Sequence, residues 1–211
     1  MYDNYVSLGR NCEAAFQFRR LLGRDVAYYF SWLVTPFEAL IAVIGDDFAG
    51  TYRKENLQVT ADSDMILDTG TGLKYHSAFR KELGRTLSGP RFEELYAESA
   101  RKYAFLAQRF RDLAGSANRV LYVVKTDEDG VRGKAARLRD LLTARYPAHD
   151  FTLVIVQEQG RGEDDWREPG IRNRYVERFA PVSRANDGHV PSWDRIFAEF
   201  PLRPGAMSQP V

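Results

Sequence analysis

The chain has 211 residues, of which 44% are hydrophobic, and its 30 basic side chains nearly balance 29 acidic ones, for a net charge of +1. This balance argues against an electrostatic interaction with nucleic acid or an anionic membrane. No apolar run approaches the roughly 20 residues of a membrane-spanning helix, and no secretory signal is evident. A single cysteine excludes an internal disulfide and a cysteine-based zinc site. We therefore expect a cytoplasmic protein without a cofactor or metal; its oligomeric state stays open.

The first fifty residues predict a strand and two helices. Residues 5–8 favour a short strand, which Gly9 ends. Asn11 is a good N-cap, and apolar residues then recur at helical spacing as far as Gly23. A second helix is expected over about 35–44, with Thr35 as N-cap and Glu38 completing a capping box.

The middle of the chain predicts a hairpin and a long helix. Residues 65–67 and 73–76 can pair as antiparallel strands across the turn at 70–72. Pro90 favours the start of a helix whose apolar stripe continues to about Gly115.

The last third predicts a parallel sheet. Residues 119–125 and 151–157 are near-continuous apolar strands, and residues 133–146 form the helix between them. This βαβ pattern indicates parallel strands in a sheet covered on both faces. A loop is expected over 160–172, a strand over 175–182 and a helix over 192–200. The overall expectation is one α/β domain over 1–200 and a flexible tail over 201–211.

Cys12 is the first candidate for chemistry. At the start of a helix, the unpaired N–H groups and the helix dipole favour an anion, and the neighbouring Arg10 acts in the same direction. These features predict a lowered thiol pKa and a cysteine that faces a cleft. The alternative is structural, because free cysteine is commonly a small buried hydrophobe.

A thiol nucleophile needs a base, and the chain has three histidines. His149 belongs to the far end of the βαβ unit. His76 ends the predicted hairpin, with Asp68 across the turn. His189 lies in an Asn-Asp-Gly-His turn that weakly echoes the Asp-x-x-His of SGNH hydrolases, although their Gly-Asp-Ser block is absent. From these residues alone, the partner could be His76 or His189.

Three motifs carry a family resemblance: SLGRNCE at 7–13, FSWLVTP at 30–36 and YHSAF at 75–79. In this order they resemble a family described as putative papain-like cysteine peptidases, and the strand at 120–125 and the segment around Trp193 are similar too. The resemblance implies that Cys12 is the nucleophile and His76 the base. We then expect a His76 ring nitrogen roughly 3–5 Å from the Cys12 sulfur.

The chain departs from the family pattern at two positions. Ser31 and Ser77 stand where the family has aspartates, before its tryptophan and after its histidine. Asp68 or Ser77 is therefore expected to orient the His76 ring. The parallel unit also differs from papain itself, whose histidine lies in an antiparallel barrel.

The predicted function is that of a cysteine-dependent acyl hydrolase or transferase acting on a peptide or small-molecule acyl substrate. Backbone N–H groups at the start of the cysteine helix, assisted by Asn11, would bind the oxyanion. The other candidate substrate-binding residues lie within the three motifs: Arg10, Ser31, Trp32 and Ser77.

Two alternatives remain. One is a non-catalytic module that binds an anion at 11–13 and a nucleotide or sugar at the βαβ edge. The other is a Rossmann-like enzyme of surface-polysaccharide synthesis.

Overall fold

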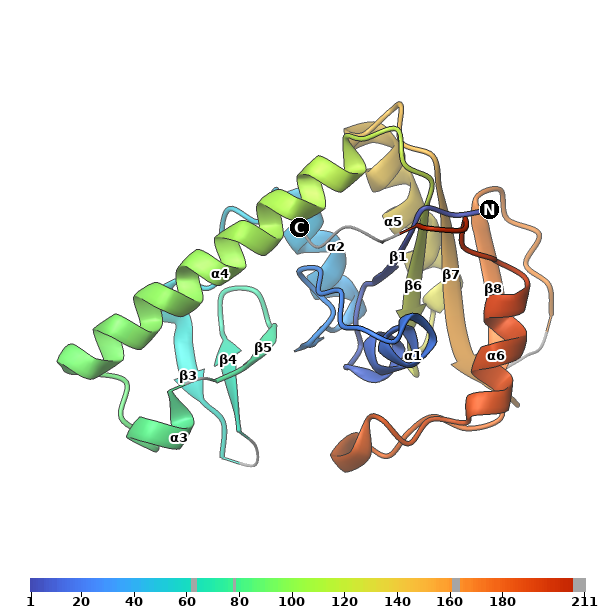
Figure 1. The fold of residues 1–211 in the computed structure, drawn as a ribbon. Helices are drawn as coiled ribbons and strands as arrows, with labels where there is room; N and C mark the ends of the chain where they lie inside the picture. Colours follow the sequence, from blue (N-terminus) through green and yellow to red (C-terminus); the bar gives the residue numbers. More distant parts are fainter. Residues whose placement is uncertain (62–63, 78, 161–163, 207–211) are drawn as a thin grey trace.

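Four parallel strands form the first of two sheets (Figure 1). The computed structural model describes residues 1–61, 64–77, 79–160 and 164–206. The strand order is β1-β6-β7-β8, with bounds β1 (Asn4–Ser7), β6 (Val120–Lys125), β7 (Phe151–Glu158) and β8 (Ile171–Val176). Helix α5 (Val131–Arg145) connects β6 to β7. The α/β fold class and the parallel βαβ unit are confirmed.

Strand β6 is buried along its whole length, which explains its continuous apolar sequence. Val120, Tyr122 and Val124 belong to the core on one face of the sheet, and Leu121 and Val123 to the core on the other. The first face packs against α5 and α2 (Phe37–Gly45), and the second against α1 (Glu13–Leu22) and α6 (Val190–Ala198).

The second sheet is antiparallel, with the order β2-β5-β4-β3. Its strands are β2 (Leu33–Val34), β3 (Leu57–Val59), β4 (Met65–Asp68) and β5 (Lys74–His76). The predicted hairpin is confirmed as β4–β5, in which Met65 pairs with His76. The short elements η1 (Lys54–Asn56), α3 (Arg80–Leu83) and η2 (Val182–Arg184) lie in connections.

Helix α4 (Pro90–Ala114) connects the two sheets, as Figure 1 shows. Its 25 residues span about 37 Å. Tyr103 packs against Tyr52 and Tyr75, with ring centroids 4.5 and 4.6 Å away. Two turns further along α4, the Phe110 ring contacts the Tyr122 ring of β6, with centroids 5.9 Å apart. One amphipathic helix therefore fixes the antiparallel sheet against the parallel one.

Two local predictions are wrong. The last strand covers Ile171–Val176 rather than 175–182, because Ile171 already pairs with Leu153 of β7. Helix α2 begins at Phe37, and its first N–H is donated to the Glu128 carboxylate at 3.0 Å. The Thr35 hydroxyl is buried without a hydrogen-bond partner among the described residues, so a remote side chain replaces the expected local cap.

The two ends of the described chain lie together. The backbone of Tyr2 bonds to the Pro201 carbonyl at 2.9 Å and to the Arg203 N–H at 2.8 Å. The beginning of the segment expected as a flexible tail is thus hydrogen-bonded to the N-terminus. The rest of that prediction, at 207–211, lies outside the described residues.

Candidate active site

A tight turn between β1 and α1 places Cys12. Gly9 has a φ of 111°, and a Cβ there would lie 2.5 Å from the Thr35 Cβ, so only glycine fits. Arg10 follows at a φ of 63°, and its carbonyl accepts the Thr35 N–H at 3.2 Å. Cys12 is the N-cap residue of α1. The turn is thereby fixed against the segment that leads into α2.

Asn11, the predicted N-cap of α1, lies one residue before the observed N-cap Cys12, and its side chain bonds to the first helical N–H. Its Oδ1 accepts the Glu13 backbone N–H at 3.1 Å and a bond from Lys125 Nζ at 3.4 Å. Both partners are donors, so the oxygen must face them and the amide nitrogen must face away. Among the described residues, that Nδ2 group has no hydrogen-bond acceptor. It remains available as a donor beside the cysteine.

A buried charge network anchors the same end of α1. Glu13 is fully buried, and its Oε2 lies 2.5 Å from Lys125 Nζ and accepts the Ala180 N–H at 3.0 Å. Its Oε1 accepts the Trp193 indole N–H at 3.0 Å. Three distant segments therefore hold the helix start through one carboxylate. The network was not predicted from the sequence, where its signal is Lys125, a charged residue that ends an otherwise apolar strand.

The structure brings Cys12 and His76 together. The Cys12 Sγ lies 3.5 Å from His76 Nε2, within the expected range. His76 is exposed at the end of β5, whereas Cys12 is only 7% exposed. Cys12 thus heads the helix as predicted, but it is less open than the predicted cleft-facing thiol, and the imidazole is the more accessible group of the pair.

The electrostatics of the pair favour its neutral form. Burial raises the pKa of the Cys12 thiol to about 11, although its own backbone N–H acts in the opposite direction. This outcome is the opposite of the lowered pKa expected from the sequence, because desolvation outweighs the helix terminus. Burial and then the Lys102 charge lower the pKa of His76, while Asp64 raises it. At neutral pH the resting pair is a thiol beside a neutral imidazole.

The other two histidines have partners elsewhere. His149 Nε2 lies 2.9 Å from the Tyr122 hydroxyl, at the opposite end of β6. His189 precedes α6, with its Nδ1 2.8 Å from the Ser192 hydroxyl and its Nε2 3.5 Å from Glu177. Neither is hydrogen-bonded to Cys12 in the described structure.

Two candidate polar residues have partners other than the imidazole. The buried Asp68 carboxylate accepts the N–H groups of Tyr52 at 2.8 Å and Gly70 at 3.0 Å, so it stabilises the hairpin turn. The Ser31 hydroxyl accepts the Tyr28 N–H at 3.0 Å. Ser77 follows His76 directly. Neither the Asp68 carboxylate nor the Ser31 hydroxyl is hydrogen-bonded to the His76 ring in the described part of the chain.

Arg10 and Trp32 occupy different surroundings. Arg10 forms an ion pair with Asp127 at 2.8 Å, and is not among the causes of the Cys12 pKa shift. The acidic turn after β6 thus binds a side chain of its own chain. Trp32 packs edge-on against Phe16, with ring centroids 5.0 Å apart.

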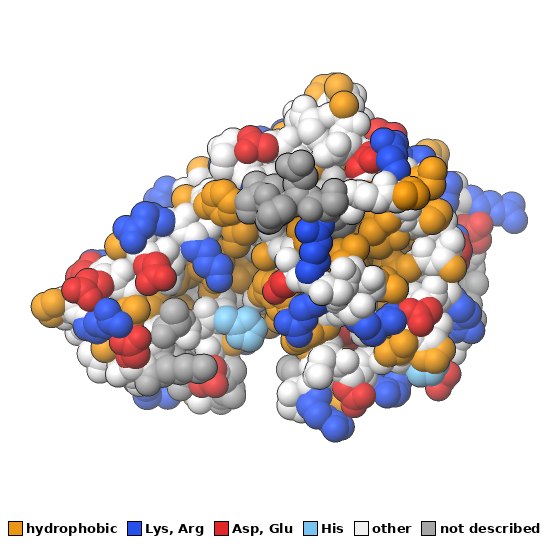
Figure 2. All heavy atoms as spheres, in the orientation of Figure 1, with side chains coloured by type: hydrophobic (Ala, Val, Ile, Leu, Met, Phe, Trp, Pro, Cys, Tyr) orange, Lys and Arg blue, Asp and Glu red, His pale blue; other side chains and the backbone are white. Residues whose placement is uncertain are grey.

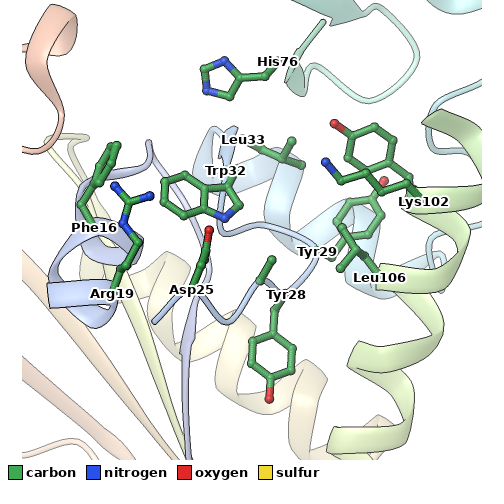
Figure 3. Close-up of a pocket in the computed structure, with 12 residues that line it drawn as sticks. Phe16, Arg19, Asp25, Tyr28, Tyr29, Trp32, Leu33, His76, Lys102 and Leu106 are labelled. Carbon is green, nitrogen blue, oxygen red and sulfur yellow. The ribbon is translucent and has the colours of Figure 1, made fainter. Parts of the chain in front are cut away.

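A cavity of about 420 Å³ opens beside His76 (Figure 3). Trp32 lines it, together with apolar and charged side chains from α1, the 25–33 segment and α4. The full lining is Phe16, Arg19, Asp25, Ala27, Tyr28, Tyr29, Trp32, Leu33, His76, Lys102, Tyr103 and Leu106. A cysteine–histidine pair therefore lies next to a concave surface large enough for a side chain or a short acyl group.

Cys12 and His76 are therefore in contact where the parallel-sheet half of the fold meets the antiparallel sheet. The chain belongs to the family described as "Putative papain-like cysteine peptidase", which matches residues 3–160. Neither a search of curated proteins nor a search of solved structures finds a match. None of the helices in the described part of the chain combines the length and hydrophobicity needed to cross a membrane.

Proposed function

We propose that the protein is a cysteine-dependent acyl hydrolase or transferase, with Cys12 as nucleophile and His76 as general base. The observation that carries this proposal is the 3.5 Å separation of Cys12 Sγ and His76 Nε2. It is close to hydrogen-bonding distance, and such distances shorten when a substrate is bound. Membership of the family supports the same chemistry.

The raised cysteine pKa determines how the first step would proceed. Because the resting thiol is neutral, His76 Nε2 takes its proton while the sulfur attacks the substrate carbonyl carbon. The carbonyl π bond opens to an oxyanion. When this collapses, the bond to the leaving group breaks, and the leaving group receives the proton from His76. Water, or another acceptor in a transferase, then attacks the thioester carbon and gives a proton to His76. When the second oxyanion collapses, the C–S bond breaks, and His76 returns that proton to the Cys12 sulfur.

The oxyanion would be bound at the start of α1. The backbone N–H of Cys12 points to its own sulfur, and the Asn11 amide nitrogen has no acceptor in the described structure. Both can donate to a negative oxygen that forms next to the sulfur. The network around Glu13 and Lys125 supports this geometry, because it fixes the turn that carries both donors.

The non-catalytic alternative is less well supported. In it, the N-terminus of α1 binds an external anion. Asn11 Oδ1 already accepts the Glu13 N–H, and the Glu13 carboxylate lies buried in the same turn. The Glu13 N–H is thus already occupied, which leaves a stable external anion only the Cys12 N–H and the Asn11 amide, the same donors proposed for the transient oxyanion. No observation on the described residues favours a sugar substrate.

Acylation by p-nitrophenyl acetate tests the proposal. We expect a burst of p-nitrophenol and one acetyl group on the peptide that contains Cys12, and Cys12→Ala should abolish both. His76→Gln should slow acylation by about 10²–10⁴-fold, the usual contribution of a general base. His189→Gln is the matched control and should keep the wild-type rate. Acetylation that persists in Cys12→Ala, or an unchanged rate in His76→Gln, would contradict the assignment.

A further inference from the structure

Two basic side chains from different helices enter the cavity beside His76. Arg19 comes from α1 and Lys102 from α4, and Figure 3 shows both directed toward the space under the His76 ring. Among the described residues, neither forms an ion pair with a carboxylate. Figure 2 shows this face hollowed between α4 and α1, with Lys and Arg side chains at the edges of the hollow.

Arg19 is held in place by aromatic rings. Its guanidinium carbon lies 4.8 Å from the Phe16 ring centroid and 5.5 Å from that of Trp32. A guanidinium that lies over an aromatic ring keeps its N–H groups free for an acceptor in the plane of the guanidinium group. Less conformational entropy is then lost when a carboxylate binds to it.

The rest of the cavity is mainly aromatic and aliphatic. Tyr28, Tyr29, Leu33 and Leu106 contribute apolar surface. Asp25 is the one carboxylate in the lining, against the two cations. The site therefore combines an apolar wall with a net positive charge.

We propose that this cavity binds a carboxylate carried on the acyl part of the substrate, through Arg19 and Lys102, while the acyl carbon lies at Cys12. The substrate class is thus an acyl compound with an acidic group, such as an acidic peptide segment or a dicarboxylic half-ester. This inference rests on the proposed function.

Binding of such a group would also strengthen the base. The groups that act on His76 are Lys102 of α4, Asp64 before β4, and Cys12 of α1. Lys102 disfavours the protonated imidazole. A carboxylate bound to Lys102 offsets its charge, so the pKa of His76 rises when the correct substrate is in place. A neutral substrate leaves the base weaker.

A pair of esters of similar size tests the charge preference. Mono-p-nitrophenyl glutarate carries the carboxylate, and its methyl ester is the neutral counterpart. At low salt we expect roughly tenfold faster acylation of Cys12 by the anionic ester, with a smaller difference at high salt. Lys102→Gln and Arg19→Gln should each reduce this preference about threefold. Asp25→Asn should increase it.

Arg101→Gln is the matched control. Arg101 precedes Lys102 on α4, is exposed and lies outside the cavity lining. The variant changes the net charge equally and should keep the wild-type preference. Equal rates for the two esters in the wild type, or a preference that is undiminished in both Lys102→Gln and Arg19→Gln, would overturn the inference.

The two proposals can fail separately. Equal acylation by both esters leaves the hydrolase proposal intact and removes the anion site. If neither ester acylates Cys12, the hydrolase proposal fails. Alkylation by iodoacetate and iodoacetamide then decides the anion site, because it needs only the thiol. Alkylation that is faster with iodoacetate than with iodoacetamide, and that loses this advantage in Lys102→Gln, supports the site. A ratio of the two alkylation rates that Lys102→Gln leaves unchanged refutes it.

Discussion

The two halves of the site are built in different ways. Cys12 belongs to the parallel-sheet half, where a fully buried carboxylate and ammonium hold the start of its helix. His76 belongs to the small antiparallel sheet, where packed tyrosine rings support an exposed strand end. Substitutions in the buried ion pair that fixes the cysteine helix should therefore lower the free energy of unfolding strongly. Substitutions in the tyrosine packing that supports His76 should lower it less. The predictions below test this difference.

The largest effect is expected at the buried ion pair. Glu13→Gln leaves the Lys125 ammonium buried without its counter-charge, so the free energy of unfolding should fall by about 3–5 kcal/mol. Urea denaturation followed by circular dichroism measures this change. If the variant does not fold, the double variant Glu13→Gln/Lys125→Met should fold, because it removes both charges.

An exposed ion pair on the same helix provides the control for Glu13→Gln. Arg20 of α1 contacts Asp194, and both side chains are substantially exposed. Asp194→Asn should cost well under about 1 kcal/mol. If Glu13→Gln is no more destabilising than Asp194→Asn, the buried pair does not anchor the cysteine helix as described.

The second effect concerns the reactivity of the thiol. The pKa of Cys12 rises from 9.0 to about 11, so the native thiolate fraction near neutral pH is roughly 100-fold below that of the unfolded chain. Iodoacetamide should therefore label native Cys12 at least about 100-fold more slowly than the urea-unfolded protein. Mass spectrometry after timed quenching gives both rates. A peptide of residues 6–18 serves as the reference thiol, and native labelling as fast as the peptide would indicate a preformed thiolate.

The third effect is on the antiparallel half. The hydroxyl groups of Tyr29 and Tyr75 are 3.0 Å apart and buried, so Tyr75→Phe removes one hydrogen bond and keeps the ring. The free energy of unfolding should fall by about 1 kcal/mol. Tyr103→Phe is the matched control, because its hydroxyl has no hydrogen-bond partner among the described residues. A loss of 3 kcal/mol or more, on the scale of the buried-charge estimate, would remove the proposed difference between the halves.

Local patterns in the sequence were sufficient for the elements that carry the site. The glycine turn before Cys12 and the hairpin that ends at His76 depend on neighbours in the chain, and both are found. The Glu13 network could not be read in this way, since Lys125 and Trp193 lie 112 and 180 residues further on. The direction of the Cys12 pKa shift also required the fold, because burial decides it.

The role expected of Asp68 illustrates what strand register adds. In the β4–β5 pair, Met65 lies opposite His76, and Asp68 is three residues further along β4. Side chains alternate between faces, so Asp68 points to the other face of the hairpin from His76, roughly 10 Å along the strand. Sequence proximity suggested a contact that this register forbids.

The smallest expected effect is on the titration of His76. Burial is the main reason that its pKa lies below 6.5, and the positive charge of Lys102 is the second. Lys102→Gln removes only the second cause, so the pKa should rise but stay below the unfolded value, because burial remains. The ring proton signals of His76, followed by NMR between about pH 5 and 8, measure this shift. Asp64→Asn should move the pKa in the opposite direction, because Asp64 favours the protonated ring.

His149 supplies an internal control in the same spectra. Its pKa is also lowered by burial, but its charged neighbour is Asp150 at the other end of the parallel sheet, so Lys102→Gln should not move it.

The effect of the His76 pKa on stability has a definite sign. A histidine whose native pKa lies below its unfolded value favours folding fully above about pH 6.5, and this contribution is lost as the pH falls through the native pKa. Raising the pKa of His76 in Lys102→Gln should therefore reduce the loss of stability on acidification. A His76 signal unmoved by Lys102→Gln would show that α4 exerts no electrostatic control over the base, and that burial alone weakens it.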